Sequence, residues 1–379
     1  MKPLDVVNEY RASQGLSDFE KQITCWAPFQ AMHIDKKGNI RPCSFALSHG
    51  EIDNETVYAP KWSPEKSLLE CWNSEVFEEM RLESMSGNLK EGYCDYCIRS
   101  TNQEKPPSSL DYDWVGGARS IAHDTPREIE LELSNTCNYM CSFCSPFCSS
   151  QHMERMGLQN DETFISVFDD PEIKKAFIED LRSIIHNLHR LNFTGGEPFA
   201  QRVVFDILKM IDEEQPKNLS LHFTTNGSVM NGIVKKLAKR PNTRFTVSLD
   251  TLDPELYPEL RVNGDLNNVM SNIETFLTSG SQVGCSFVVS KKNVRELPRI
   301  VSWCNKKDIE FTYHMIEPMW WGKEYEDIIN PMKVELETKE YLDELKTYLK
   351  NSNIDISSTD KELSHKNIRM FKQYIERIK

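Results

Sequence analysis

The sequence has no long hydrophobic run. No stretch of its 379 residues approaches the ~18 consecutive apolar residues that a membrane-spanning helix requires. The N-terminal segment, MKPLDVVNEYRASQG, also lacks the apolar core of a secretory signal peptide. The sequence therefore predicts a cytoplasmic protein without membrane partners.

Positive charge is also scarce. The 45 basic residues are outnumbered by 58 acidic ones, which gives a formal net charge of −13. Proteins bind nucleic-acid backbones through clusters of Lys and Arg, so a chain this acidic argues against a nucleic-acid partner. The sequence contains no internal repeat and no low-complexity tract. Its length suggests two or three structural units.

Cysteine, by contrast, is abundant. Eleven cysteines in a chain expected to be cytoplasmic argue against a disulfide framework and for metal or redox chemistry. Three of them stand in the motif CNYMCSFC (137–144), with the spacing C-x3-C-x2-C. A closed structural zinc site takes four ligands, so three thiolates leave one metal position for another group. A zinc site completed by Cys148 or His152 is one way to fill that position.

Short apolar runs alternate with helical patterns from residue 128 onward. Strands are expected at 128–134, 189–194, 219–225, 243–249, 282–290 and 309–316. Helices are expected at 171–188, 203–211, 232–240, 267–279 and 296–307. This alternation predicts a parallel sheet. If the sheet curls into a barrel, the carboxyl ends of its strands line one mouth, where functional residues collect.

Polar motifs follow the predicted strands in order. TGGEP (194–198) follows the second strand, TTNG (224–227) the third and SLD (248–250) the fourth, with Arg261 eleven residues further on. Glycines allow a ligand to approach the backbone closely, and a glutamate offers a carboxylate to an ammonium group. Each motif alone is ordinary loop chemistry, but their shared position at strand ends indicates one site.

Taken together, the three-cysteine motif and the motifs at the strand ends resemble the radical S-adenosylmethionine (SAM) superfamily. Its signature is C-x3-C-x2-C with an aromatic residue before the last cysteine, and Phe143 fills that place. The resemblance covers about residues 125–320. It implies that three irons of a 4Fe–4S cluster are held by Cys137, Cys141 and Cys144, while the fourth iron binds the amino and carboxylate groups of SAM.

The same resemblance implies which residues bind SAM. The superfamily's glycine–glutamate motif binds the amino group, and its later motifs contact the ribose and the carboxylate. In this chain, the resemblance implies that the ribose of SAM is contacted by Ser248 and Asp250 and that its carboxylate is contacted by Arg261. The full set of expected SAM-binding residues is Gly195, Gly196, Glu197, Asn226, Ser248, Asp250 and Arg261.

The first hundred residues carry a second cysteine group. A strand–turn–strand around Lys37-Gly38-Asn39 is expected to bring the first two cysteines of this group together, and the last two have a chelating spacing. With the segment WNSE-x-F-x-x-x-R, this layout resembles the SPASM and twitch auxiliary-cluster modules, which follow the barrel in better-known members. The resemblance implies a second cluster, expected to be 4Fe–4S, with a zinc knuckle as the alternative. Its ligands would be Cys25, Cys43, Cys94 and Cys97. Cys71, between Leu and Trp, is expected in the core.

The expected fold is therefore α/β. It consists of a partial (β/α)6 TIM-like barrel, a small N-terminal cysteine-rich module that binds a cluster, and a C-terminal helical extension. The expected domains are the auxiliary module at 1–105, a linker at 106–127 that is rich in Pro, Gly and Ser, the barrel at 128–322 and the extension at 323–379.

The implied function is reductive cleavage of SAM to a 5′-deoxyadenosyl radical, which abstracts hydrogen from a carbon of a small-molecule or peptide substrate. An electron donor such as flavodoxin or ferredoxin is implied, and the auxiliary cluster would accept an electron in an oxidation. The alternatives are a redox-neutral epimerase, a peptide-modifying enzyme and a metal-binding adaptor. An epimerase needs a thiol as hydrogen donor, for which Cys285 is a candidate, although it also suits a core position. Further substrate candidates are Glu132, His222 and His314.

Overall fold

The structure is a computed structural model. It describes residues 23–47, 49–52, 55–102, 124–290 and 292–315. The predicted C-terminal extension and most of the predicted linker lie outside the described residues. Within them, no helix is both long and apolar enough to cross a membrane.

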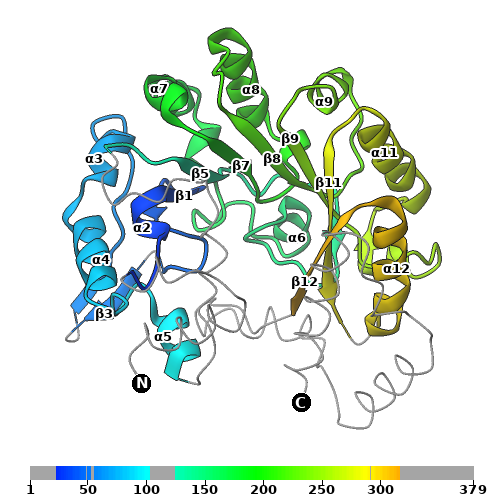
Figure 1. Cartoon of the computed structure of the whole chain (residues 1–379), viewed down its shortest axis with the longest axis horizontal. Helices are drawn as coiled ribbons and strands as arrows, with labels where there is room; N and C mark the ends of the chain where they lie inside the picture. Colours follow the sequence, from blue (N-terminus) through cyan, green and yellow to red (C-terminus); the bar gives the residue numbers. More distant parts are fainter. Residues whose placement is uncertain (1–22, 48, 53–54, 103–123, 291, 316–379) are drawn as a thin grey trace. The chain divides into compact units, whose positions relative to one another are not determined.

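Eight strands form the main sheet (Figure 1). Their hydrogen-bonded order is β12-β11-β9-β8-β7-β5-β1-β2. The strands are β1 (Ala31–Asp35), β2 (Ile40–Arg41), β5 (Glu128–Glu132), β7 (Arg190–Phe193), β8 (Ser220–Thr225), β9 (Thr243–Ser248), β11 (Gln282–Val289) and β12 (Glu310–Met315). β1 with β5, β5 with β7, β9 with β11 and β11 with β12 pair in parallel, whereas β2 runs antiparallel to β1.

Helices follow the parallel strands as the sequence predicted. They are α7 (Pro171–Ile184), α8 (Arg202–Glu214), α9 (Gly232–Ala238), α11 (Leu266–Thr278) and α12 (Leu297–Lys307). Short polar side chains fix where several begin: Asp170, Asn231 and Asp265 each accept hydrogen bonds from first-turn N–H groups. The mostly parallel sheet with its helices confirms the predicted α/β class and is consistent with a partial TIM-like barrel.

The remaining elements are short. The helices are α2 (Ala27–Gln30), α3 (Leu68–Trp72), α4 (Glu75–Met85), α5 (Asp95–Asn102), α6 (Ser150–Arg155) and α10 (Tyr257–Leu260). Single 3-10 turns lie at η3 (Val167–Asp169), η4 (Ile185–Asn187), η5 (Pro198–Ala200) and η6 (Val294–Glu296). Two small antiparallel pairs join β3 (His49–Ile52) to β4 (Glu55–Tyr58) and β6 (Met140–Cys141) to β10 (Arg261–Val262).

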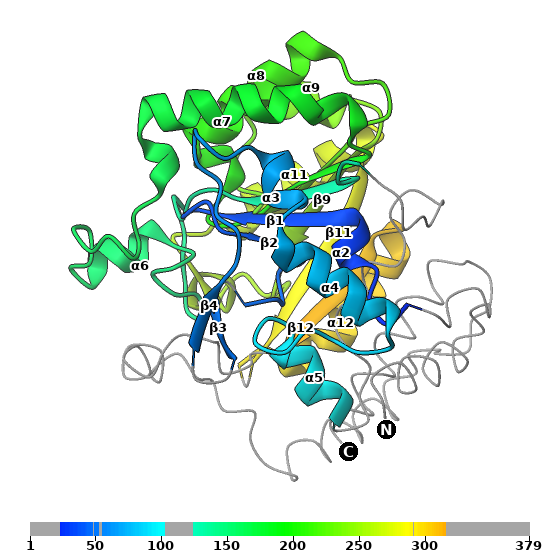
Figure 2. The same ribbon diagram turned by 90° about the vertical axis from the view of Figure 1, so that its left-hand side faces the viewer.

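The expected strand–turn–strand is the hairpin of β1 and β2. Gly38 adopts a φ of +80° in its turn, and the Asp35 carboxylate accepts the backbone N–H groups of Lys37 and Asn39. The sequence did not reveal that β1 pairs with β5, so that Ala31 stands opposite Glu128. The N-terminal residues thus add two strands to the main sheet, with α2 leading into β1 and α4 packed beside α2 (Figure 2).

The described residues divide into two compact units. The first unit contains the described residues up to Asn135, together with Ile165–Gly195 and Gln201–Leu221. The second contains Thr136–Phe164, Gly196–Ala200 and the described residues from His222 onward. All three cysteines of the C-x3-C-x2-C motif belong to the second unit, and the four N-terminal cysteines belong to the first. The domain boundaries expected from the sequence stay a prediction.

Candidate functional site

The loop that carries the three-cysteine motif is held by hydrogen bonds within the second unit. The buried His152 ring donates from Nε2 to the Cys141 carbonyl oxygen at 2.8 Å. Ser149 Oγ donates to the Tyr139 carbonyl at 3.0 Å, and the Cys137 N–H donates to Ser150 Oγ at 3.1 Å. α6, which starts at Ser150, thereby fixes the backbone on which the thiols stand.

The three thiols are buried enough to perturb their chemistry. Burial raises the pKa of Cys137 to about 12, and it also raises the pKa values of Cys141 and Cys144. The neighbouring Cys148 thiol raises the pKa of Cys144 further. A metal must therefore displace protons from these thiols, because only thiolates are ligands.

Cys148 and His152, which were considered as a fourth zinc ligand, have different surroundings. The only ring N–H of a neutral His152 that can reach the Cys141 carbonyl is at Nε2, so this nitrogen is engaged in holding the loop. Cys148 lies near Cys144. Among the residues that the structure describes, no three His, Cys, Asp or Glu side chains converge as the ligands of a single metal ion do.

Glu197 is fully buried and tightly oriented. One carboxylate oxygen accepts hydrogen bonds from Thr225 Oγ1 at 2.7 Å and the Phe199 N–H at 3.2 Å. The other accepts the Asn226 N–H at 2.7 Å. Burial raises its pKa, while these hydrogen bonds oppose that shift. A carboxylate has about four lone-pair positions, so about one remains for a further donor.

The glycines before Glu197 have backbone conformations that favour glycine. Gly195 has a φ of +72° and Gly196 a φ of +51°. In the first unit, a Cβ atom on Gly195 would overlap Glu132 Cγ and lie 3.2 Å from the Ser134 carbonyl oxygen. Glycine at 195 is therefore required by close packing as well as by φ.

Arg261 is a buried residue that contacts a carboxylate, a cysteine thiol and an aromatic ring. Its Nη2 is 2.6 Å from Asp250 Oδ2, and both side chains are buried. Its Nη1 donates to Cys141 Sγ at 3.5 Å, and its guanidinium carbon lies 5.5 Å from the centre of the Phe143 ring. Its Nε–H is buried without a hydrogen-bond partner among the described residues. A buried N–H of this kind fits an anionic group such as the carboxylate of SAM.

Asn226 and Ser248, the other expected contacts of SAM, differ in what they contact. Asn226 Nδ2 donates to Asn138 Oδ1 at 2.8 Å, and Asn226 Oδ1 accepts the Ser228 N–H at 2.9 Å. This side chain therefore ties the cysteine loop to the turn after β8. Ser248 is partly exposed on β9, opposite Ser286 of β11. The SAM-binding roles of both residues stay predictions.

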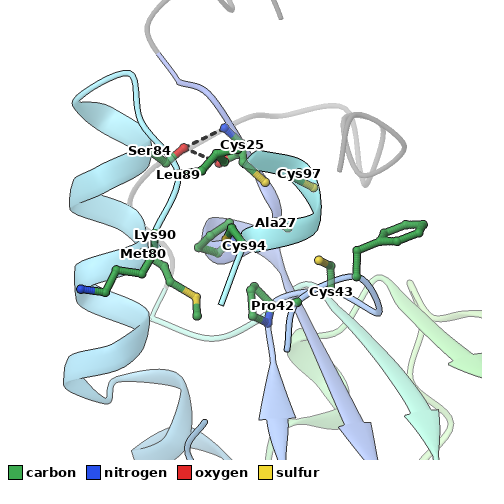
Figure 3. A pocket seen from close by; sticks show the side chains of 13 residues that line it. Cys25, Ala27, Pro42, Cys43, Met80, Ser84, Leu89, Lys90, Cys94 and Cys97 are labelled. Atoms are coloured by element: carbon green, nitrogen blue, oxygen red, sulfur yellow. Dashed lines mark hydrogen bonds between the residues drawn. The ribbon is translucent and has the colours of Figure 1, made fainter. Parts of the chain in front are cut away.

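The four N-terminal cysteines meet in one place. Figure 3 shows Cys25, Cys43, Cys94 and Cys97 around a single pocket of the first unit. The other lining side chains are mostly apolar, and they include Ala27, Pro42, Met80 and Leu89. Burial raises the pKa values of the Cys43 and Cys94 thiols, and the nearby thiols of this group raise them further. The predicted convergence of Cys25 on Cys43 is thus present, and four thiols around one pocket fit a fully ligated cluster.

Ser84 of α4 holds the first of these cysteines. The Cys25 N–H donates to Ser84 Oγ at 2.7 Å, and Ser84 Oγ donates to the Cys25 carbonyl at 2.7 Å (Figure 3). This buried serine could not be recognised from the sequence, because a serine inside a helix is not distinctive. Cys71, expected in the core, is fully buried in α3 beside Trp72.

The candidate hydrogen donor Cys285 is buried in β11. Its thiol lies 3.8 Å from the Leu249 carbonyl oxygen and close to the thiol of Cys304 in α12. Its neighbours in register are the apolar Val247 and Phe311. These surroundings suit the core position considered for it.

The substrate candidates are distributed over both units. His222 is partly buried on β8, and His314 is placed only by its position opposite Val288 on β12. In the first unit, Glu132 Oε2 lies 3.3 Å from His33 Nε2, and His33 Nδ1 accepts Arg41 Nη2 at 2.8 Å. The sequence analysis missed His33 and Arg41, whose only signal was their position on the N-terminal hairpin.

The structure thus places a three-cysteine loop in the second unit and a four-cysteine pocket in the first, beside a mostly parallel sheet. Residues 131–304 match the model of the radical SAM superfamily, and residues 25–98 match that of an iron–sulfur cluster-binding domain. Residues 131–304 therefore resemble the radical SAM superfamily, and the segment that resembles the cluster-binding domain lies on their N-terminal side. These matches confirm the predicted cofactors, iron–sulfur clusters and SAM.

Curated relatives match part of the chain. It is 30% identical to the "Probable GTP 3′,8-cyclase" of Methanocaldococcus jannaschii over 50% of this chain and 58% of that protein. It is 27% identical to the protein of the same name from Sulfurisphaera tokodaii over 60% of this chain and 72% of that protein. Streptococcus suis SuiB bound to precursor peptide SuiA aligns with a TM-score of 0.43 and 20% identity, over 60% of this chain and 46% of SuiB. The chain thus spans little more than half of the first of these proteins.

Proposed function

We propose that this chain reductively cleaves SAM and uses the resulting 5′-deoxyadenosyl radical to abstract hydrogen from a carbon of a small-molecule or peptide substrate. The observation that supports this most directly is the surroundings of Cys141. Its thiol belongs to a group of three, and a buried guanidinium with an unpaired Nε–H lies beside it. A 4Fe–4S cluster held by these thiols would supply the single electron, and an external flavodoxin or ferredoxin would replace it.

The charged side chains of the second unit complement the amino-acid end of SAM. An α-amino acid group carries an ammonium and a carboxylate. Glu197 keeps about one lone-pair position open for the ammonium, and Arg261 keeps an unpaired N–H for the carboxylate. Both side chains are already oriented by buried hydrogen bonds or ion pairs, so binding needs little further ordering of the protein.

The first unit supports an oxidation in which the auxiliary cluster accepts the second electron. The carbonyl of Ala46, which lines the four-cysteine pocket, accepts Arg41 Nη1 at 3.0 Å. Arg41 also donates to His33, which lies 3.3 Å from Glu132 at the carboxyl end of β5. A carbon radical that bears a hydroxyl or amino group loses a proton and an electron when it is oxidised. A cluster held by the four N-terminal cysteines would accept that electron, and the proton would leave to water.

The redox-neutral alternative receives less support from the described residues. Epimerisation needs a thiol that returns a hydrogen atom to the substrate, and the Cys285 thiol instead contacts Leu249 and Cys304 inside the core. The substrate class stays broad. The relatives named for a GTP cyclase and the solved structure with a bound precursor peptide make both small molecules and peptides reasonable first substrates to test.

Anaerobic reconstitution with iron, sulfide, SAM and dithionite tests the proposal. We expect release of 5′-deoxyadenosine by the native chain and none by the Cys141→Ala variant. Cys148→Ala is the matched control, because this cysteine lies near the motif and is not one of the three proposed ligands. Release that stops in the Cys148→Ala variant, or that never occurs in the native protein loaded with iron, would contradict the proposed function.

A further inference from the structure

Arg261 makes a contact that SAM binding does not require. Its Nη1 lies 3.5 Å from Cys141 Sγ, within hydrogen-bonding range of sulfur, while Nη2 is held by Asp250. The two nitrogens point to different partners, so one guanidinium joins a buried carboxylate to the sulfur of a proposed cluster ligand. The third nitrogen, Nε, remains for SAM.

The position of this guanidinium is determined by the protein before any ligand binds. Asp250 Oδ1 accepts the Val288 N–H at 2.7 Å, so the carboxylate that holds Arg261 is itself held by β11. The fully buried Asn293 donates from Nδ2 to the carbonyl oxygens of Asp250 and Val288, at 3.0 and 2.9 Å. The backbone at Cys141 is fixed as well, because β6 pairs Cys141 with Arg261 in register.

The charge at this position is permanent and poorly screened. Arginine keeps its proton in proteins, and the Arg261 side chain is only 6% exposed. A buried charge acts more strongly on its neighbours than one in water. Asp250 offsets part of the positive charge, but the Arg261 Nη1–H still donates to the Cys141 sulfur.

We propose that Arg261 tunes the reduction potential of the cluster bound by Cys137, Cys141 and Cys144, by donating a charged hydrogen bond to the Cys141 sulfur. This rests on the proposed function only in that these three cysteines hold a cluster. Reduction adds an electron to the cluster and its thiolates. A cationic donor on one of the sulfurs stabilises the reduced state more than the oxidised state, because hydrogen bonds and net charge at the sulfurs set the potential. Arg261 therefore makes the cluster easier to reduce.

The test is a potentiometric titration followed by electron paramagnetic resonance, without SAM or substrate. Three anaerobically reconstituted proteins are compared: the native chain, Arg261→Gln and Lys292→Gln. Lys292 is the matched control, because its exposed ammonium pairs with Glu259 at 2.8 Å and contacts no cysteine. The auxiliary cluster in each protein is an internal reference.

We expect Arg261→Gln to lower the midpoint potential of the three-cysteine cluster so that its reduction equilibrium falls at least tenfold. For a one-electron couple this corresponds to about 59 mV. The auxiliary cluster and the Lys292→Gln protein should keep the native potentials. Arg261→Lys retains the charge but lacks the planar guanidinium with its several N–H donors. The midpoint potential of its three-cysteine cluster should therefore lie between those of the native and Arg261→Gln proteins.

Two results overturn the inference. One is an unchanged midpoint potential in Arg261→Gln at native iron content. The other is loss of half of the iron in both the glutamine and lysine variants, which would make Arg261 a structural residue of the loop. Either result leaves the proposed function standing if the native chain still cleaves SAM. If the native chain binds no cluster at the three cysteines, the proposed function fails instead.

Discussion

The serine that holds Cys25 gives the sharpest prediction about the auxiliary site. Ser84→Ala removes one buried hydroxyl and with it two hydrogen bonds of 2.7 Å, one to the N–H and one to the carbonyl of Cys25. Loss of a partner for a buried polar group costs about 1–3 kcal/mol, so two such losses lower the free energy of unfolding by about 2–6 kcal/mol. The same change frees the first ligand of the four-cysteine pocket.

Ser86→Ala is the matched control, because Ser86 lies two residues further along and donates to the Leu82 carbonyl from an exposed position. A surface change of this kind should shift stability by about 0.5 kcal/mol or less. Urea unfolding of both variants and iron analysis after anaerobic reconstitution make the comparison. Equal stability and equal iron content in Ser84→Ala and Ser86→Ala would refute the role of this serine in holding Cys25.

Three further predictions concern the clusters, SAM and pH. The native chain should hold about eight irons, and the triple variant Cys137→Ala/Cys141→Ala/Cys144→Ala about half, because two separate 4Fe–4S clusters are expected; complete loss of iron would contradict independent sites. Glu197→Gln should weaken SAM binding about tenfold or more in calorimetry with the iron content unchanged, since a charge-assisted hydrogen bond contributes about 1.5–3 kcal/mol; native affinity would remove this carboxylate from the SAM site. Burial raises the pKa of Glu132, but His33, Arg41 and Lys36 together outweigh it and lower the pKa from 4.5 to about 2. The contribution of Glu132 to stability is therefore present above pH 4.5 and is lost as the pH falls through 2. In the Glu132→Gln variant, the free energy of unfolding measured in urea should change less between pH 4.5 and pH 2 than in the native protein. The same pH dependence in both proteins would argue against the ion pair of Glu132 with His33.

Several features of the fold could be predicted because they depend on local patterns. Strands β5, β8 and β9 lie within the ranges expected from their apolar alternation, and α7 starts at Pro171 directly after its aspartate cap. The pairing of β1 with β5 could not be predicted in this way. The two strands are far apart in the sequence, and nothing in AMHID identifies a partner.

In the candidate site, too, contacts between residues far apart in the sequence could not be predicted. The chelating spacing of Cys94 and Cys97 and the expected hairpin between Cys25 and Cys43 pointed to two pairs of cysteines, and the family resemblance joined them into the four-cysteine pocket. Spacing did not show that Arg261 contacts Cys141, because this contact depends on the β6–β10 pairing. Nor did it show that Asn226 ties the cysteine loop to the turn after β8.

The most direct test of the account is whether SAM itself binds iron at the three-cysteine site. Electron–nuclear double resonance on the reduced protein with SAM labelled with ¹⁵N in its amino group and ¹⁷O in its carboxylate reports this contact. The account predicts hyperfine coupling to both labels, which disappears in the Cys141→Ala variant. A reduced cluster that binds SAM without coupling to either label would contradict it, because the fourth iron would then belong to another ligand.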